Sequence, residues 1–68
     1  MTPSEAGAYI MPFGKHKGCT LDDILEDDPS YINWMIEEDI KFQDPRGTEA
    51  WEIFANDSDV LYDLKESL

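Results

Sequence analysis

The stretch from Pro29 to Ile40 places the strongest limit on how this chain folds. Asp28 and Pro29 form a clear helix start, because Asp favours the N-cap and Pro the first helical position. Apolar residues then recur with a helical period over a wide arc, at Tyr31, Ile32, Trp34, Met35, Ile36 and Ile40. The pattern predicts a central helix over residues 29–40. It favours a core position for Trp34 over a role as a base-stacking surface.

Length and cysteine content set further limits. A chain of 68 residues forms one domain, and a domain of this size removes only about 60% of its unfolded surface from water. Cys19 is the only cysteine, which excludes an intrachain disulfide and the usual structural zinc patterns. No stretch has the character of a signal peptide or a membrane span. We therefore expect a soluble, cytoplasmic protein with no cofactor and no membrane partner.

The charge balance is strongly acidic. Sixteen Asp and Glu residues stand against five Lys and Arg residues, so the formal net charge is -11. This balance disfavours wrapping around a phosphate backbone, because that kind of binding depends on Lys and Arg. It favours attraction to basic surfaces, and we expect a protein partner with such a surface. The apolar surplus near the C-terminus suits a dimer as well as a monomer.

The N-terminal part predicts a β-hairpin. Residues 9–13 and 15–19 contain β-favouring residues, and Gly14 between them supplies the positive φ of a tight turn. A proline in the first strand cannot donate to a ladder, which places that strand at an edge. Residues 1–8 show no periodic pattern and predict a flexible arm. The predicted fold class is α+β: residues 9–68 form one small domain with an N-terminal β-hairpin packed on three to four short helices.

Further helices are predicted on both sides of the central one. Thr20 is a suitable N-cap for a short helix, with Asp23 in the third position of a capping box. Thr48 is a suitable N-cap for a later helix. Residues 48–68 can form one long helix or two short ones, and a break at residues 56–58 is favoured because Asn, Asp and Ser favour caps and turns. The helical spacing resumes after this break and extends to Leu68.

The triplet Lys15-His16-Lys17 is the main candidate for binding, in an otherwise acidic chain. At alternate strand positions the two lysines share one face, with His16 on the other. The lysines then suit one phosphate or one acidic patch of a partner. Lysines also protect edge strands from aggregation, and both interpretations stay open. His16 and Cys19 lack an identifiable third orienting group, so catalysis is not expected.

A family resemblance rests on four short motifs. They are FGKHKG at 13–18, TL at 20–21, DDPSY at 27–31 and WM at 34–35. Together they resemble the small C-terminal domain of exodeoxyribonuclease X-like proteins and related short stand-alone proteins of bacteria and phages, over about residues 10–40. The resemblance implies an accessory module of DNA processing, with nuclease chemistry in a separate domain. Cys19 replaces a more usual polar residue, and this departure, like the acidity, favours a protein partner.

Two functional hypotheses remain. The first is a non-catalytic binding module associated with DNA processing, which binds through Lys15, His16 and Lys17 with support from Tyr31 and Trp34. Its partner is a protein such as a DNA-processing enzyme, and direct nucleic-acid contact is restricted to the Lys15–Lys17 turn. The second is an acidic DNA mimic, with a phage as one source, that inhibits a host DNA-binding or defence enzyme. Its candidate carboxylates are Asp22, Asp23, Asp27, Asp28, Glu37, Glu38 and Asp39.

Overall fold

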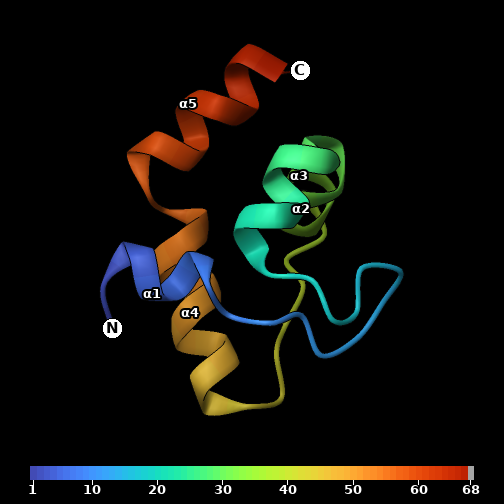
Figure 1. Cartoon of the computed structure of the whole chain (residues 1–68), viewed down its shortest axis with the longest axis vertical. Helices are drawn as coiled ribbons and strands as arrows, with labels where there is room; N and C mark the ends of the chain where they lie inside the picture. The colour runs from blue at the N-terminus through green and yellow to red at the C-terminus, as the bar shows by residue number, and fades with distance from the viewer. Residues whose placement is uncertain (68) are drawn as a thin grey trace.

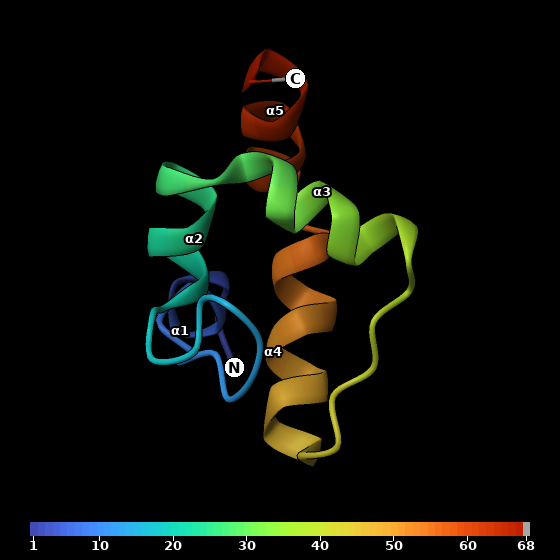
Figure 2. The same ribbon diagram turned by 90° about the vertical axis from the view of Figure 1, so that its right-hand side faces the viewer.

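Residues 1–67, the part of the chain that the computed structural model describes, form helices joined by two long and two short connections. Figure 1 shows the order of these helices along the chain. In the view of Figure 2, α3 crosses the molecule between α4 and α5. The predicted extension of the last helix to Leu68 lies outside the described residues. The helices are α1 (Pro3–Gly7), α2 (Leu21–Asp27), α3 (Pro29–Glu37), α4 (Pro45–Ala55) and α5 (Ser58–Ser67).

The predicted β-hairpin, and with it the α+β class, is wrong. Within residues 1–67 the strand pairing consists of one isolated antiparallel bridge, between Ile10 and Thr20. The chain does return on itself here, because the Met11 N–H donates to the Cys19 carbonyl at 2.8 Å. Pro12 has no N–H to continue a ladder. The residues beyond it satisfy their backbone groups in successive tight turns, so the fold is all-helical (Figure 1).

The expected flexible arm is a short helix. Thr2 and Glu5 form a reciprocal capping box at the start of α1, with N–O distances of 2.9 and 3.2 Å. Pro3 occupies the first helical position, which needs no N–H donor. Ala6 is fully buried, and α1 packs mainly against α4. The capping signal was present in the sequence, but a helix this short shows no apolar period.

The predicted starts of α2 and α3 are confirmed. The Thr20 hydroxyl accepts a hydrogen bond from the Asp23 N–H at 3.1 Å, and Pro29 is the first residue of α3. The end of α3 was predicted too late, because the helix stops at Glu37. Asp39 adopts a left-handed φ of 52°, and the N–H of the residue after it donates to Met35 at 3.1 Å. This arrangement caps the final carbonyls of α3.

The start of α4 lies earlier than predicted. Asp44 is the N-cap, and its carboxylate accepts from the Arg46 N–H at 3.3 Å. Thr48, the predicted cap, lies inside the helix and donates its hydroxyl proton to the Phe42 carbonyl at 3.0 Å. The predicted break at residues 56–58 is confirmed, since α4 ends at Ala55 and α5 begins at Ser58.

The core draws on every helix and on both long connections. Its aromatic part is a row of rings in which Phe42 contacts Tyr9, Phe13 and Trp51, with centroid distances of 5.3–6.0 Å. Apolar residues of α2 and α3 complete it and fix the helix pair that carries the site described next. The buried core residues are Ala6, Met11, Leu21, Ile24, Ile32, Met35, Phe42, Ala50, Trp51, Phe54, Val60 and Leu64.

Candidate functional site

The basic turn is a compact loop that leans on α3. Gly14 and Gly18 both have left-handed φ angles, of 82° and 93°. Between them the Lys17 N–H donates to the Gly14 carbonyl at 3.2 Å, which closes a tight turn. A Cβ atom at Gly14 would lie 2.5 Å from the Tyr31 hydroxyl oxygen. Gly14 is therefore required both by the backbone conformation and by the close approach of α3.

One carboxylate holds the turn against the start of α3. Asp28 Oδ2 lies 3.1 Å from His16 Nε2 and 3.2 Å from Lys15 Nζ. Asp28 Oδ1 accepts a hydrogen bond from the Ser30 hydroxyl at 2.8 Å. Both oxygens are thus engaged by side chains, which explains why Asp28 stands at the predicted N-cap position without a side-chain bond to the helix backbone. We call Asp28 the anchor carboxylate.

The electrostatics of the anchor carboxylate follow from these contacts. The hydrogen bond from Ser30 is the largest cause that lowers the pKa of Asp28, followed by the bond from His16. Lys15 lowers it further through a hydrogen bond and its positive charge, and partial burial opposes the shift. The resulting pKa lies well below the usual range of an Asp side chain. Asp28 therefore stays ionised at any physiological pH.

Aromatic rings continue the site along α3. The His16 ring packs edge-on against Tyr31 with centroids 4.7 Å apart, and Tyr31 packs against Trp34 at 5.5 Å. Lys15 Nζ lies 5.7 Å from the centre of the Tyr31 ring. Trp34 is 47% exposed, so the prediction that it belongs to the core is wrong. The buried face of α3 is narrower than predicted and holds Ile32 and Met35.

The structure brings four of the five predicted site residues together. Lys15, His16, Tyr31 and Trp34 form a connected group, and the Lys15 side chain remains 68% exposed within it. Lys17 is exposed on the same turn and makes no ion pair within residues 1–67. The predicted sharing of one strand face by Lys15 and Lys17 is wrong, because this segment is a turn. We call these five residues, with Asp28, the turn surface.

Ser30 was missed as a site residue, and Asp28 was predicted only as part of the acidic surface. Asp28 was assigned to helix capping and to an acidic row, and nothing in the local pattern links it to His16, which lies 12 residues away. The remaining acidic candidates are exposed: Asp22, Asp23 and Asp27 on α2, and Glu37, Glu38 and Asp39 at the end of α3. Asp39 pairs with Lys41 at 3.1 Å.

The turn surface offers an oriented imidazole, two ammonium groups and two neighbouring aromatic rings. A His–Asp pair can orient an imidazole, and here the imidazole also packs against Tyr31. Across residues 1–67, no group of three or more His, Cys, Asp or Glu side chains is arranged to hold a metal ion. None of the helices in the described range is long and apolar enough to cross a membrane.

Comparison with known proteins gives a match for the part of the chain that contains the turn surface. The family described as exodeoxyribonuclease X-like C-terminal matches residues 11–39, which include the turn, α2 and α3. No curated protein and no solved structure gives a significant match to this chain. The matched range contains every residue of the turn surface, whereas α1, α4 and α5 lie outside it. The predicted resemblance is confirmed over residues 11–39, which are similar to the exodeoxyribonuclease X-like C-terminal family.

Proposed function

We propose that this chain is a non-catalytic accessory module of DNA processing, and that its turn surface contacts single-stranded DNA over one or two nucleotides. The observation that carries the proposal is the half-exposed Trp34, packed on Tyr31, with Lys15 beside the Tyr31 ring and Lys17 exposed on the same turn. The family match supports the association with DNA processing, because the family takes its description from an exodeoxyribonuclease.

The ring arrangement suits a nucleobase. Stacking of a base on an aromatic side chain is worth about 1–3 kcal/mol and tolerates any sequence. Trp34 is supported from one side by Tyr31, which is itself supported by His16. A supported ring loses little side-chain freedom on binding, so more of the stacking energy contributes to affinity.

The charges restrict the contact to a short one. Lys15 and Lys17 are the cations on the turn, while the formal net charge of the chain is -11. A longer stretch of backbone phosphates would meet exposed carboxylates on α2 and α3. A contact this small is weak by itself. It becomes effective when the module is held beside an enzyme that binds the same strand, because the second contact is then intramolecular.

The test is fluorescence titration of the full chain with a short single-stranded oligonucleotide at two salt concentrations. We expect quenching of tryptophan emission and a slope of log K against log salt of about -1.4, since each phosphate contact on a single strand contributes about -0.7. The double variant Lys15→Ala/Lys17→Ala removes both the binding and the slope. Trp34→Ala, which lacks the reporting ring and is therefore followed by the anisotropy of a labelled oligonucleotide, weakens binding at both salt concentrations without changing the slope.

Lys41→Ala/Lys65→Ala is the matched control, because it removes the same charge from exposed lysines outside the turn surface. Equal losses in the two double variants would show that only overall charge matters. Unchanged binding in the Lys15/Lys17 variant would contradict the proposal.

A second candidate, the acidic DNA mimic, is favoured by the exposed carboxylates of α2 and the end of α3. The set of candidate carboxylates for this function excludes Asp28, because Asp28 is engaged by Lys15 and His16 and cannot belong to an open acidic row. In this case the chain inhibits a DNA-binding enzyme in competition with DNA. Asp22→Lys/Asp23→Lys abolishes the inhibition, and Lys15→Ala/Lys17→Ala leaves it intact. The reverse result excludes the mimic.

A further inference from the structure

Two basic side chains of the turn meet at one carboxylate oxygen. His16 Nε2 lies 3.1 Å from Asp28 Oδ2, and Lys15 Nζ lies 3.2 Å from the same atom. The other oxygen of Asp28 accepts from the Ser30 hydroxyl at 2.8 Å. Two positive groups this close together repel each other. The contact between Lys15 and Asp28 therefore depends on the charge of the imidazole.

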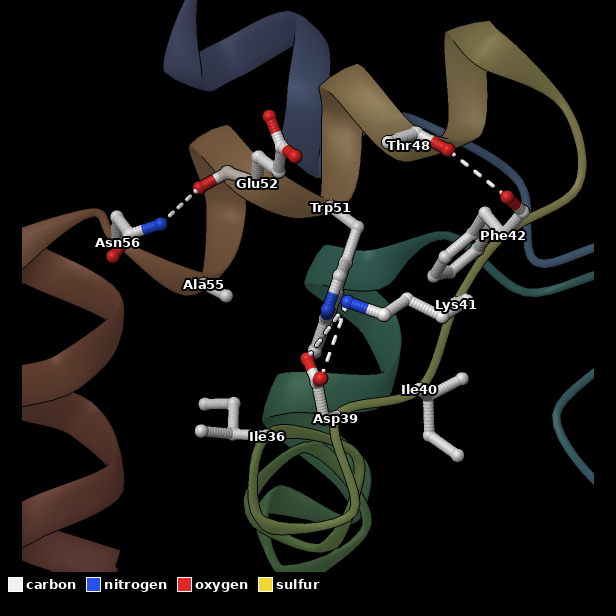
Figure 3. Close-up of a pocket in the computed structure, with 10 residues that line it drawn as sticks. All are labelled: Ile36, Asp39, Ile40, Lys41, Phe42, Thr48, Trp51, Glu52, Ala55 and Asn56. Carbon is white, nitrogen blue, oxygen red and sulfur yellow. Dashed lines mark hydrogen bonds and ion pairs between the residues drawn. The ribbon is translucent and has the colours of Figure 1, made fainter.

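Lys41, which is also ion-paired, has no such competitor. It lies 3.1 Å from Asp39, and both residues line a hollow beside α4 (Figure 3). Within residues 1–67, no other basic side chain pairs with the Asp39 carboxylate. This pair is therefore a reference for a lysine–carboxylate contact that no histidine shares.

The His16 ring can take up a proton without losing its contact. Asp28 is ionised and can only accept a hydrogen bond, so Nε2 of the imidazole already carries a proton. Nδ1 has no hydrogen-bond partner within residues 1–67, and no buried side-chain nitrogen or oxygen in this range lacks one, so Nδ1 reaches solvent. Protonation at Nδ1 therefore charges the ring and leaves its bond to Asp28 in place.

The ionisable side chains around the ring lie on the turn or at the start of α3. They are Lys15, Lys17, Cys19, Asp28 and Tyr31. Within residues 1–67, Asp28 is the carboxylate that pairs with the ring. Histidine is the residue type whose charge ordinarily changes between about pH 5 and 8. We therefore expect a pH response of the turn in this range to come from His16.

When both basic groups are charged, His16 is better placed to keep the contact. Its side chain is 19% exposed, and its ring packs on Tyr31 with centroids 4.7 Å apart. The Lys15 side chain is 68% exposed and has a long, flexible stem. A group that packing already holds loses less conformational entropy in the contact than a flexible one. Lys15 is therefore the group that leaves.

We propose, on the basis of the function proposed above, that protonation of His16 releases Lys15 from Asp28 and so strengthens the binding of single-stranded DNA. At neutral pH the Asp28 carboxylate competes with a DNA phosphate for the Lys15 ammonium. Once the imidazole is charged, it neutralises the carboxylate, and Lys15 pairs with a phosphate instead. Binding is then tighter in mildly acidic than in neutral solution.

The first measurement follows the free protein by NMR from about pH 7.5 to about pH 5.8, where histidine ordinarily titrates. We expect the Cε signal of Lys15 to move toward that of an unpaired lysine, with the same midpoint as the ring signals of His16. The Cε signal of Lys41 is the internal reference and should stay constant, because no histidine shares its pair with Asp39. A Lys15 signal that stays constant while His16 titrates would overturn the release and leave the proposed function standing.

The second measurement is the dissociation constant of a rhodamine-labelled hexathymidylate, taken from its anisotropy at the same two pH values. About 0.15 M NaCl keeps the Debye length near about 8 Å and limits diffuse attraction. We expect the affinity of the wild type to be about threefold to fivefold higher at the lower pH, the size of an exposed ion pair. His16→Gln should lose this dependence. No binding by the wild type at either pH would overturn the proposed function and this regulation with it, and the NMR result would still report whether Lys15 is released.

Single lysine variants separate the release of Lys15 from the charge of His16 itself. Lys17→Ala removes a lysine of the same turn that makes no ion pair within residues 1–67, so it should weaken binding and keep the pH ratio. Lys15→Ala should also weaken binding, but its pH ratio should fall below about twofold, because no lysine is left to release. Equal pH ratios in the two variants would show that the imidazole charge acts on DNA directly, and would overturn the proposal.

Discussion

The turn surface and the aromatic core around α4 are held by different forces. In the turn, one carboxylate joins Lys15, His16 and Ser30, and most of the participating atoms remain near solvent. In the core, Phe42, Trp51 and Phe54 are buried with at most 8% exposure. Apolar burial supplies most of the folding free energy, and charged contacts near solvent supply little. The charged contacts of the turn can therefore be lost while the fold persists. Loss of the buried apolar contacts of the core would unfold the protein.

The largest expected effect is in the core. Phe54 is 1% exposed, and Phe54→Ala should destabilise the protein by about 3–5 kcal/mol through lost burial and a cavity. The total stability of a 68-residue domain is about 3–10 kcal/mol, so the variant is partly or fully unfolded at 25 °C. Urea unfolding followed by circular dichroism measures this. Tyr62→Ala, at a residue 62% exposed, is the control and should change stability by less than about 0.5 kcal/mol.

The two glycines of the turn sharpen the comparison. Gly14→Ala should destabilise by about 2–3 kcal/mol, because it combines a left-handed backbone with a collision against the Tyr31 hydroxyl. Gly18→Ala should destabilise by about 1 kcal/mol, since its φ is similar but no atom lies within 4 Å of the added Cβ. The same urea experiment tests both. Equal effects would show that the Tyr31 contact is not a fixed part of the turn.

The anchor carboxylate gives a pH-dependent prediction. The folded state lowers the pKa of Asp28, so its contribution to stability is complete above the unfolded value of about 3.9 and is lost as the pH falls toward the folded pKa. Asp28→Asn should lower the urea midpoint at pH 7 by less than Gly14→Ala does. Between pH 7 and pH 3 the difference between wild type and Asp28→Asn should shrink. A difference that stays constant over this range would contradict the role of the ionised carboxylate.

The smallest expected effect lies at the end of α3. Asp39 is a non-glycine residue with a φ of 52°, and Asp39→Gly should raise stability by about 0.5 kcal/mol because glycine adopts this conformation without a steric penalty. Its ion pair with Lys41 has both side chains 81% exposed and contributes little. Asp39→Ala loses the same ion pair but keeps the strained backbone, so it should be less stable than Asp39→Gly. The reverse order would contradict the capping role of this position.

Local signals in the sequence predicted what depends on neighbouring residues. The N-cap at Thr20, the helix start at Pro29 and the break at residues 56–58 all follow from short-range backbone chemistry, and all three are present. Residues 9–19 do fold back on themselves, as predicted. The β-hairpin prediction failed because tight turns occupy residues 14–19, so that only one bridge forms between the two arms.

The candidate site was predictable in its residues but not in its geometry. The lysines and His16 were identified from their position in the turn. Their anchor, Asp28, lies 12 residues from His16 and was assigned to the start of a helix. The exposure of Trp34 was also missed, because a helical period predicts which residues share a face and says nothing of how much of that face the neighbouring helices cover.

By itself the sequence determined the acidity, the starts of two helices, the family resemblance of residues 11–39 and the basic turn. These follow from composition, from capping chemistry and from short motifs, which act over a few residues. Only the tertiary structure decided that Asp28 holds the turn, that Trp34 is exposed and that Lys15 and His16 share one oxygen of Asp28. Each of these depends on contacts between segments distant in sequence, and the packing of the helices determines those contacts.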